Sequence, residues 1–239
     1  MKSLLLACVA FITFSSFTDH ETITGNGNLK KETRKASNYT GISLSGHMNV
    51  EIAYGNSNDV TIEADENLLP YIETKVEDGN LVIRAKDKVN LKSRNKMIIN
   101  ASATKLANIK IMGSGNINGK GDFTNDGRTS IDVMGSGNVN LAFNSFNETK
   151  VSIAGSGNVD LKGKHTNNVT ASVSGSGDIN CSDVRTNDAF ANVSGSGNIK
   201  VYATRTIDAK ISGSGNVYYK GDAPKVSVKT SGSGRVMKA

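Results

Sequence analysis

The residue types that do nucleophilic or metal chemistry are present in this chain, but their spacing forms no catalytic or metal-binding pattern. The three histidines, His20, His47 and His165, lie far apart and lack the spacing of metal ligands. Seven serines lie inside identical Gly-Ser-Gly tripeptides, whereas a catalytic serine would be singular and paired with a base. The only two cysteines, Cys8 and Cys181, exclude a C-x-x-C zinc arrangement. The sequence therefore predicts no catalytic residue, no cofactor site and no metal site.

Four carboxylates keep an enzymatic alternative open. Asp132, Asp160, Asp178 and Asp183 lie on the repeats described below, and a pair of carboxylates could hydrolyse a glycoside. Parallel β-helices also host enzymes that act on polysaccharides. However, the column of Asp132 is otherwise filled by Lys, Ser and Asn, and that of Asp160 mostly by Asn and Lys, so scattered surface charge explains these residues better. We predict a non-enzymatic protein, with a polysaccharide-active enzyme as the alternative.

The aromatic side chains offer one further candidate. Sugar-binding sites usually present aromatic platforms, and the one aromatic cluster here consists of Tyr202, Tyr218 and Tyr219. The cluster fits either a sugar platform or packing between the last repeats, and the sequence leaves both interpretations open.

Length and composition exclude several classes. The chain has 239 residues, of which 37% are hydrophobic, so a packed domain is expected rather than disorder. The net charge of +6 is far from the dense Lys and Arg clustering of a nucleic-acid protein. We therefore expect no nucleic-acid partner.

Residues 1–18 have the order of a secretory signal peptide. One lysine precedes an apolar run from Leu4 to Phe14, and small polar residues follow, with cleavage expected near Ser15 to Thr18. The run is too short for a membrane span. Cys8 comes too early to be the lipid-anchored residue of a lipoprotein. We expect an exported protein with no transmembrane span, located in the periplasm, on the outer-membrane surface or outside the cell.

An internal repeat supplies the strands that would position any site. The tripeptide Gly-Ser-Gly recurs seven times at intervals of 18 to 22 residues. Positions four and two before it, and four and six after it, are mostly apolar and often β-branched, as in Val151, Ile153, Val159 and Leu161. Alternation with period 2 indicates half-buried strands on both sides of each tripeptide. Stacking such units predicts a single-stranded parallel β-helix, or solenoid, with coils of about 20 residues spaced about 4.8 Å apart.

The tripeptides and the residue that follows them define the predicted turn and ladder. Glycine accepts a positive φ in the turn, and stacked amides can hydrogen-bond to one another along the axis. A calcium stripe fits less well, because calcium-binding solenoids have a nonapeptide period and only Asp178 is acidic in this column. The turn and ladder residues are Gly113, Gly115, Asn116, Gly135, Gly137, Asn138, Gly155, Gly157, Asn158, Gly175, Gly177, Asp178, Gly195, Gly197, Asn198, Gly213, Gly215, Asn216, Gly232 and Gly234.

The expected organisation has one domain after the signal peptide. Residues 19–36 form an N-terminal segment that leads into the solenoid, and residues 37–239 form a single solenoid domain. Within it, residues 37–100 are degenerate or capping coils and residues 101–239 are the repeats. An open solenoid needs such a β cap over its end.

Several features of the N-terminal third support this division. Gly46-His47-Met48, followed by Asn49, is a degenerate copy of the tripeptide, and Thr24 to Leu29 resembles an earlier, partial copy. Asp78-Gly79-Asn80 predicts a turn before a strand at Leu81–Arg84. Glu66 to Ile72 predicts a short helical turn.

The order of these segments resembles a known family. TGNGNLKKETRKASNYTGISLSGHMNVEIAYG, then VTIEADENLLPYIETKVEDGNLVIRAK, then the iterated GSGN[IV], is similar to bacterial secreted proteins with the auto-transporter adhesin head GIN domain. The resemblance runs from about Thr22 to Ala239. It implies an exported bacterial protein with a right-handed single-stranded β-helix. It implies no reaction and supplies no catalytic residues.

The sequence therefore favours an exported, non-enzymatic β-solenoid that acts in adhesion or cell-envelope binding. The expected partners are cell-surface or envelope polysaccharides or proteins, contacted along the sides of the solenoid. Besides the polysaccharide-active enzyme, a structural envelope protein that self-associates end to end is the remaining alternative.

Overall fold

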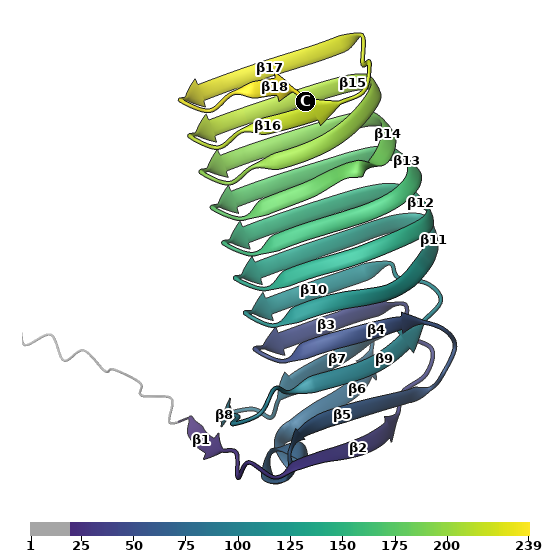
Figure 1. Cartoon of the computed structure of the whole chain (residues 1–239), viewed down its shortest axis with the longest axis vertical. Coiled ribbons are helices and arrows are strands. Elements are labelled where there is room, and N and C mark those ends of the chain that lie inside the picture. Colours follow the sequence, from purple (N-terminus) through teal and green to yellow (C-terminus); the bar gives the residue numbers. More distant parts are fainter. Residues whose placement is uncertain (1–19) are drawn as a thin grey trace, which may run out of the picture.

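The protein is a stack of parallel β-coils, described over residues 20–239 by a computed structural model (Figure 1). The predicted signal peptide, residues 1–18, lies outside the described residues. The elements are β1 (Glu21–Thr24), β2 (Leu29–Lys35), β3 (Gly41–Gly46), β4 (Asn49–Tyr54), β5 (Asp59–Asp65), η1 (Glu66–Tyr71), β6 (Ile72–Glu77), β7 (Asn80–Ala85), β8 (Val89–Lys92), β9 (Ile98–Ala103), β10 (Asn108–Gly113), β11 (Asn116–Gly135), β12 (Asn138–Gly155), β13 (Asn158–Gly175), β14 (Asp178–Gly195), β15 (Ile199–Gly213), β16 (Val217–Lys220), β17 (Lys225–Gly232) and β18 (Val236–Lys238). The predicted parallel β-solenoid is confirmed.

Each coil has three sides. We call the strand that leads into a Gly-Ser-Gly the A side, the strand that leaves it the B side, and the segment that returns to the next A side the C side. In β11 to β14 one long curved strand runs through the B, C and A sides in turn (Figure 1). Equivalent residues of successive coils lie directly opposite one another, as Ile131, Val151 and Ala171 do on the A side.

The inward columns of the A and B sides form the core that the repeat predicts. Ile153, Val159 and Leu161 are at most 2% exposed, like most members of their columns. The C side adds an inward layer that the apolar columns do not predict. There the rings of Phe123 and Phe143 have centroids 6.2 Å apart, and Phe143 and Phe146 lie 5.0 Å apart. All three phenylalanines are buried.

The turn between the A and B sides depends on glycine. Gly175 has a φ of +128°, a conformation that side chains with a Cβ rarely adopt. A Cβ there would lie 2.3 Å from the carbonyl oxygen of Gly155 in the preceding coil. That oxygen accepts hydrogen bonds from the backbone N–H groups of Ser176 and Gly177, at 2.9 and 3.1 Å. Close stacking of the turns therefore needs the missing side chain.

The N-terminal end of the stack is closed by the predicted cap. β2 pairs antiparallel with β5, and β5 with β9, while β6 and β7 form a hairpin whose turn residues Asp78 and Gly79 have positive φ. η1 is the predicted short helical turn, and its Leu68 is fully buried. The Arg34 guanidinium donates hydrogen bonds to the carbonyl oxygens of Leu69 and Ile72, at 2.9 and 2.6 Å.

One expectation for this region is wrong. Residues Thr24 to Leu29 do not form an earlier coil, because β1 pairs with β8 in a separate two-stranded sheet. The chain reaches β2 through Gly25, which packs against the side chain of Asp65. The buried Asp65 carboxylate accepts hydrogen bonds from the Ser93 hydroxyl and the Arg94 backbone N–H. These contacts hold the segment against the cap instead of in the stack.

Candidate functional site

The residues after the tripeptides form a hydrogen-bonded ladder along one edge of the solenoid. The Asn138 amide donates to Asn116 Oδ1 at 2.7 Å, and the Asn158 amide donates to Asn138 Oδ1 at 2.9 Å. Asn198 donates in the same way to the Asp178 carboxylate, at 2.9 Å. The ladder continues into the degenerate copy, because Asn116 donates to Asn49 Oδ1 at 2.7 Å. These side chains therefore use their hydrogen-bonding groups on one another.

The four carboxylates singled out in the sequence do not all share one side of the solenoid, because Asp132 lies apart from the other three. Asp132 is on the A side of β11, whereas Asp160 and Asp178 are on the B sides of β13 and β14. Asp160 accepts a hydrogen bond from Asn180, and Asp183 lies 4.0 Å from the Lys220 ammonium. Among residues 20–239, no group of three His, Cys, Asp or Glu side chains is placed to hold a metal ion.

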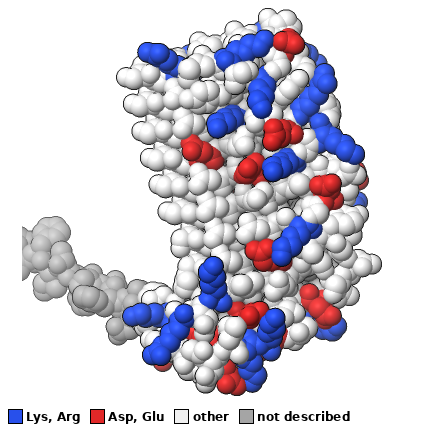
Figure 2. Space-filling model, viewed as in Figure 1, with Lys and Arg blue, Asp and Glu red and all other residues white. Residues whose placement is uncertain are grey.

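A shallow groove of about 530 Å³ lies on the outer B side, over the last coils. Its lining includes Asp178, Asn180, Lys200, Tyr218 and Lys220. Figure 2 shows the B-side surface, where positive and negative side chains are interspersed over the upper coils and the cap. The groove therefore combines amide, carboxylate, ammonium and aromatic groups on one open surface.

Two tyrosines and two lysines alternate in this region. In the pairing of β15 with β16, Lys200 is opposite Tyr218, and Tyr202 is opposite Lys220. Because residues two apart on a strand point to the same face, all four side chains lie on the outer B side. The Arg185 guanidinium also lies 6.0 Å from the centre of the Tyr202 ring. We call Lys200, Tyr202, Tyr218 and Lys220 the Tyr-Lys cluster.

The structure divides the tyrosines that the sequence left ambiguous. Tyr219 packs partly against the core, whereas Tyr202 and Tyr218 belong to the outer face. The equivalent positions in earlier coils carry Asn118, Asn140 and Asp160 where the last coils carry Lys200 and Tyr218. Lys200 and Lys220 were not predicted as site residues, although the change from Asn and Asp to Lys and Tyr in this column distinguishes the last coils.

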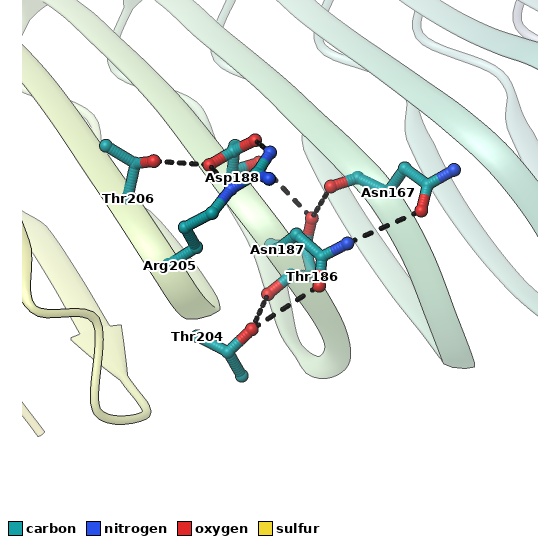
Figure 3. A network of polar contacts seen from close by, with 7 residues as sticks. All are labelled: Asn167, Thr186, Asn187, Asp188, Thr204, Arg205 and Thr206. Atoms are coloured by element: carbon teal, nitrogen blue, oxygen red, sulfur yellow. Dashed lines mark hydrogen bonds and ion pairs between the residues drawn. The ribbon is translucent and has the colours of Figure 1, made fainter.

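A second polar network lies on the C side of β13, β14 and β15 (Figure 3). The Thr186 hydroxyl donates to the carbonyl oxygen of Asn167 at 3.0 Å. The Thr204 hydroxyl donates to the carbonyl oxygen of Thr186 at 3.1 Å. Thr186 is fully buried. Its hydroxyl satisfies a carbonyl of the preceding coil inside the stack, so this network stabilises the fold.

The same network holds a buried carboxylate. Asp188 is 8% exposed and accepts hydrogen bonds from Arg205, at 2.9 Å from Nε, and from the Thr206 hydroxyl (Figure 3). These hydrogen bonds, first from Arg205 and then from Thr206, lower the pKa of Asp188 to about 2. The ionised carboxylate is therefore stabilised in the folded protein.

Asp188 makes stability depend on pH in the acid range. In an unfolded chain its pKa would be about 3.9, so the ion pair contributes fully above pH ~4 and is lost as the pH falls towards ~2. We expect Arg205→Gln to lower the free energy of unfolding modestly at neutral pH, because the carboxylate loses its main hydrogen-bond donor while solvent around the exposed guanidinium screens the pair. The difference from the wild type should shrink below pH ~4. Urea unfolding at several pH values measures it, and a difference independent of pH would contradict this role.

Cys181 provides an independent check of the coil register. It lies in an inward column, is 1% exposed, and burial, followed by the charge of Asp160, raises its pKa to about 12. Because the thiolate is the reactive form, a maleimide should label the native protein at least about a hundredfold more slowly than the denatured protein. Mass spectrometry of timed samples measures both rates. Similar rates would show that this side chain does not face the core.

The stacked coils define the class of this protein as a β-solenoid, and comparison with known families agrees. The chain matches the family described as "Putative auto-transporter adhesin, head GIN domain" over residues 38–223. It therefore belongs to that family, which supports a role in adhesion. No curated protein matches the chain. Among residues 20–239, no helix has the length and apolar character needed to cross a membrane.

Solved structures share the fold over almost the whole chain. One, described as a putative adhesin from Bacteroides fragilis, is 24% identical, with a TM-score of 0.81 and coverage of 91% of this chain and 100% of that one. Another, from Parabacteroides distasonis, is described as a putative lipid binding protein. It is 28% identical, with a TM-score of 0.71 and coverage of 92% and 100%. A third, a putative adhesin from Parabacteroides merdae, is 24% identical, with a TM-score of 0.68 and coverage of 91% and 99%.

Proposed function

We propose that this protein is an exported, non-enzymatic adhesion module that binds a cell-surface or envelope polysaccharide at the Tyr-Lys cluster. The observation that carries the proposal is the alternation of Tyr and Lys on neighbouring coils, beside the groove. A tyrosine ring offers an apolar face to the C–H groups of a sugar and a hydroxyl at its edge. Lys200 and Lys220 can donate hydrogen bonds to sugar hydroxyl or carboxylate groups.

The shape of the groove supports a polymer more than a small metabolite. Small-molecule sites usually enclose most of their ligand, whereas this groove is shallow and open along the coils. An extended glycan can lie across several coils and gather weak contacts from each. Asn180 and Asp178 lie on the coil next to Lys200 and would extend the contact: Asp178 Oδ1 accepts from Asn198 in the ladder, and its Oδ2 can accept from a sugar hydroxyl.

Binding to immobilised bacterial polysaccharides and to a glycan array tests the proposal. We expect Tyr218→Ala and Lys200→Ala each to weaken binding by about tenfold or more, as losses of buried contacts at a binding site do. Lys162→Ala is the matched control, because Lys162 lies on the B side of β13, outside the groove lining. Equal binding by the wild type and Tyr218→Ala would exclude the cluster as the site.

The same samples test the enzymatic alternative and a lipid alternative. Chromatography of the glycans after long incubation should show no cleavage products, and products that disappear on replacing one B-side carboxylate would make the protein an enzyme. Binding to lipid vesicles without binding to any glycan would instead favour a lipid ligand, as the description of the Parabacteroides distasonis structure suggests for that protein.

Export is tested on the protein made by cells. We expect a mature N-terminus near Ser15 to Thr18, determined by mass spectrometry of the exported fraction. An intact Met1 on the cellular protein would contradict the proposed signal peptide.

A further inference from the structure

We propose that the outer A side is an interface between two copies of this chain, packed face to face. This surface, which we call the A face, is formed by the positions three and one residues before each tripeptide. Its members from β10 to β17 are Lys110, Met112, Asp132, Met134, Ser152, Ala154, Ser172, Ser174, Asn192, Ser194, Lys210, Ser212, Lys229 and Ser231. The A face lies on a different side of the solenoid from the Tyr-Lys cluster, so the inference does not depend on the proposed function.

The A face exposes apolar side chains on a regular sheet. Met112, Met134 and Phe190 are 38%, 41% and 45% exposed, although each is a large hydrophobic residue. Phe190 lies beside the A face, two residues before Asn192 on the same side of β14. A shallow depression of about 590 Å³ runs over the coils between Met134 and Ser194. Regular sheets with exposed apolar groups commonly pack against another surface.

The A face changes in bulk along the solenoid axis. Met112 is opposite Met134 in the first two coils, and the next coil places Ala154 opposite Met134. From β13 onwards the same column contains only serine, from Ser174 to Ser231. One end of the face therefore projects, and the other end is recessed.

A two-fold axis that lies between the two copies, over β13 and parallel to its strand, makes this face complementary to itself. The axis places the A side of β11 against that of β15 in the second copy. Asp132 then faces Lys210 of the second copy, and Met134 enters the recessed region at Ser212. Phe190 faces Lys150 of the second copy, which suits a cation–π contact. By symmetry, each of these contacts occurs twice.

Charge selects this arrangement over the other simple one. A two-fold axis parallel to the solenoid, over the column three residues before the tripeptides, would place Asp132 opposite Asp132 and Lys210 opposite Lys210, and both pairs would repel. The proposed axis leaves one repulsive pair, Lys110 with Lys229, at the ends of the face, where solvent screens it.

The area is sufficient for a stable dimer. The seven A-side strands from β10 to β17 cover about 34 Å at ~4.8 Å per strand, and strands of six residues are about 20 Å long. Each copy thus offers roughly 680 Å², or about 1,350 Å² for both, within the range of specific interfaces. Serine and alanine lose little side-chain entropy when they are buried. The grooves of both copies would remain open and could bind a polysaccharide bivalently.

Sedimentation velocity from micromolar to hundreds of micromolar protein tests the interface. We expect the wild type to dimerise, and Asp132→Lys and Lys210→Asp each to weaken the dimer by about tenfold or more. Combining both changes in one chain should restore the dimer, and mixing the two single variants should give a heterodimer. Both results follow only if Asp132 and Lys210 meet across the interface.

Two further variants keep the result unambiguous. Ser174→Lys brings two like charges together near the axis and should abolish the dimer, whereas Lys120→Asp on the B side should leave it unchanged. Circular dichroism confirms that each variant is folded. A wild type that stays monomeric over the whole range, or end-to-end association that these A-face changes do not alter, would overturn the proposal.

Discussion

Gly175→Ala is expected to destabilise the protein by about 3–4 kcal/mol, because the turn leaves no room for a Cβ. The new methyl group would lie 2.3 Å from the Gly155 carbonyl oxygen, a backbone atom fixed by hydrogen bonds from two N–H groups. The φ of +128° adds conformational strain for any residue but glycine. Relief requires two coils to separate, which breaks these hydrogen bonds. Urea unfolding followed by circular dichroism measures the loss.

Gly127→Ala is the matched control. Gly127 lies on the C side of β11, and a Cβ there would meet only the Asn125 side chain, at 3.8 Å. Its effect should stay within about 1 kcal/mol. If both substitutions cost the same free energy, close stacking of the tripeptides would not be what requires glycine.

Phe143→Ala is expected to cost about 3–5 kcal/mol, as truncation of a buried aromatic side chain usually does. Phe143 is 2% exposed and contacts the rings of both Phe123 and Phe146, so its removal leaves a cavity in the middle of the aromatic layer. Neighbouring coils are tied by β ladders along the A and B sides, on both sides of the aromatic layer, and cannot close readily around the space. The free energy of unfolding in urea reports the change.

Phe143→Leu separates the cavity from other causes. Leucine keeps much of the buried volume but not the ring, so its cost should be clearly smaller, at about 1–2 kcal/mol. Equal losses for alanine and leucine would show that ring geometry, not filled volume, stabilises the C side.

The sequence predicts the A and B sides well because each coil repeats them with the same apolar columns around the same tripeptide. Exact stacking follows, since a shift by one residue would turn Ile153 or Val159 outward. The C side was not predicted, because its register slips between coils. Shifts occur between Asn118 and Asp122 and around Phe123, so inward residues do not recur at a fixed distance from the glycines.

The candidate site was harder to predict for a related reason. The column six residues after the tripeptide places Tyr219 towards the core, as the structure shows, but the sequence did not separate it from Tyr202 and Tyr218 as candidate sugar-binding residues. Lys200 pairs with Tyr218 across the coil whose two Gly-Ser-Gly tripeptides are 18 residues apart instead of the more usual 20. The A face was equally hidden, because its complementarity arises only when seven coils are stacked.

Protease accessibility on intact cells tests the central claim of adhesion most directly. An adhesion module must meet its ligand outside the cell, so we expect added protease to digest the mature chain while a periplasmic marker survives. The open groove and the side faces would then be available to a polysaccharide of a neighbouring surface. Protection of the chain until the outer membrane is opened would contradict adhesion and confine the protein to periplasmic partners.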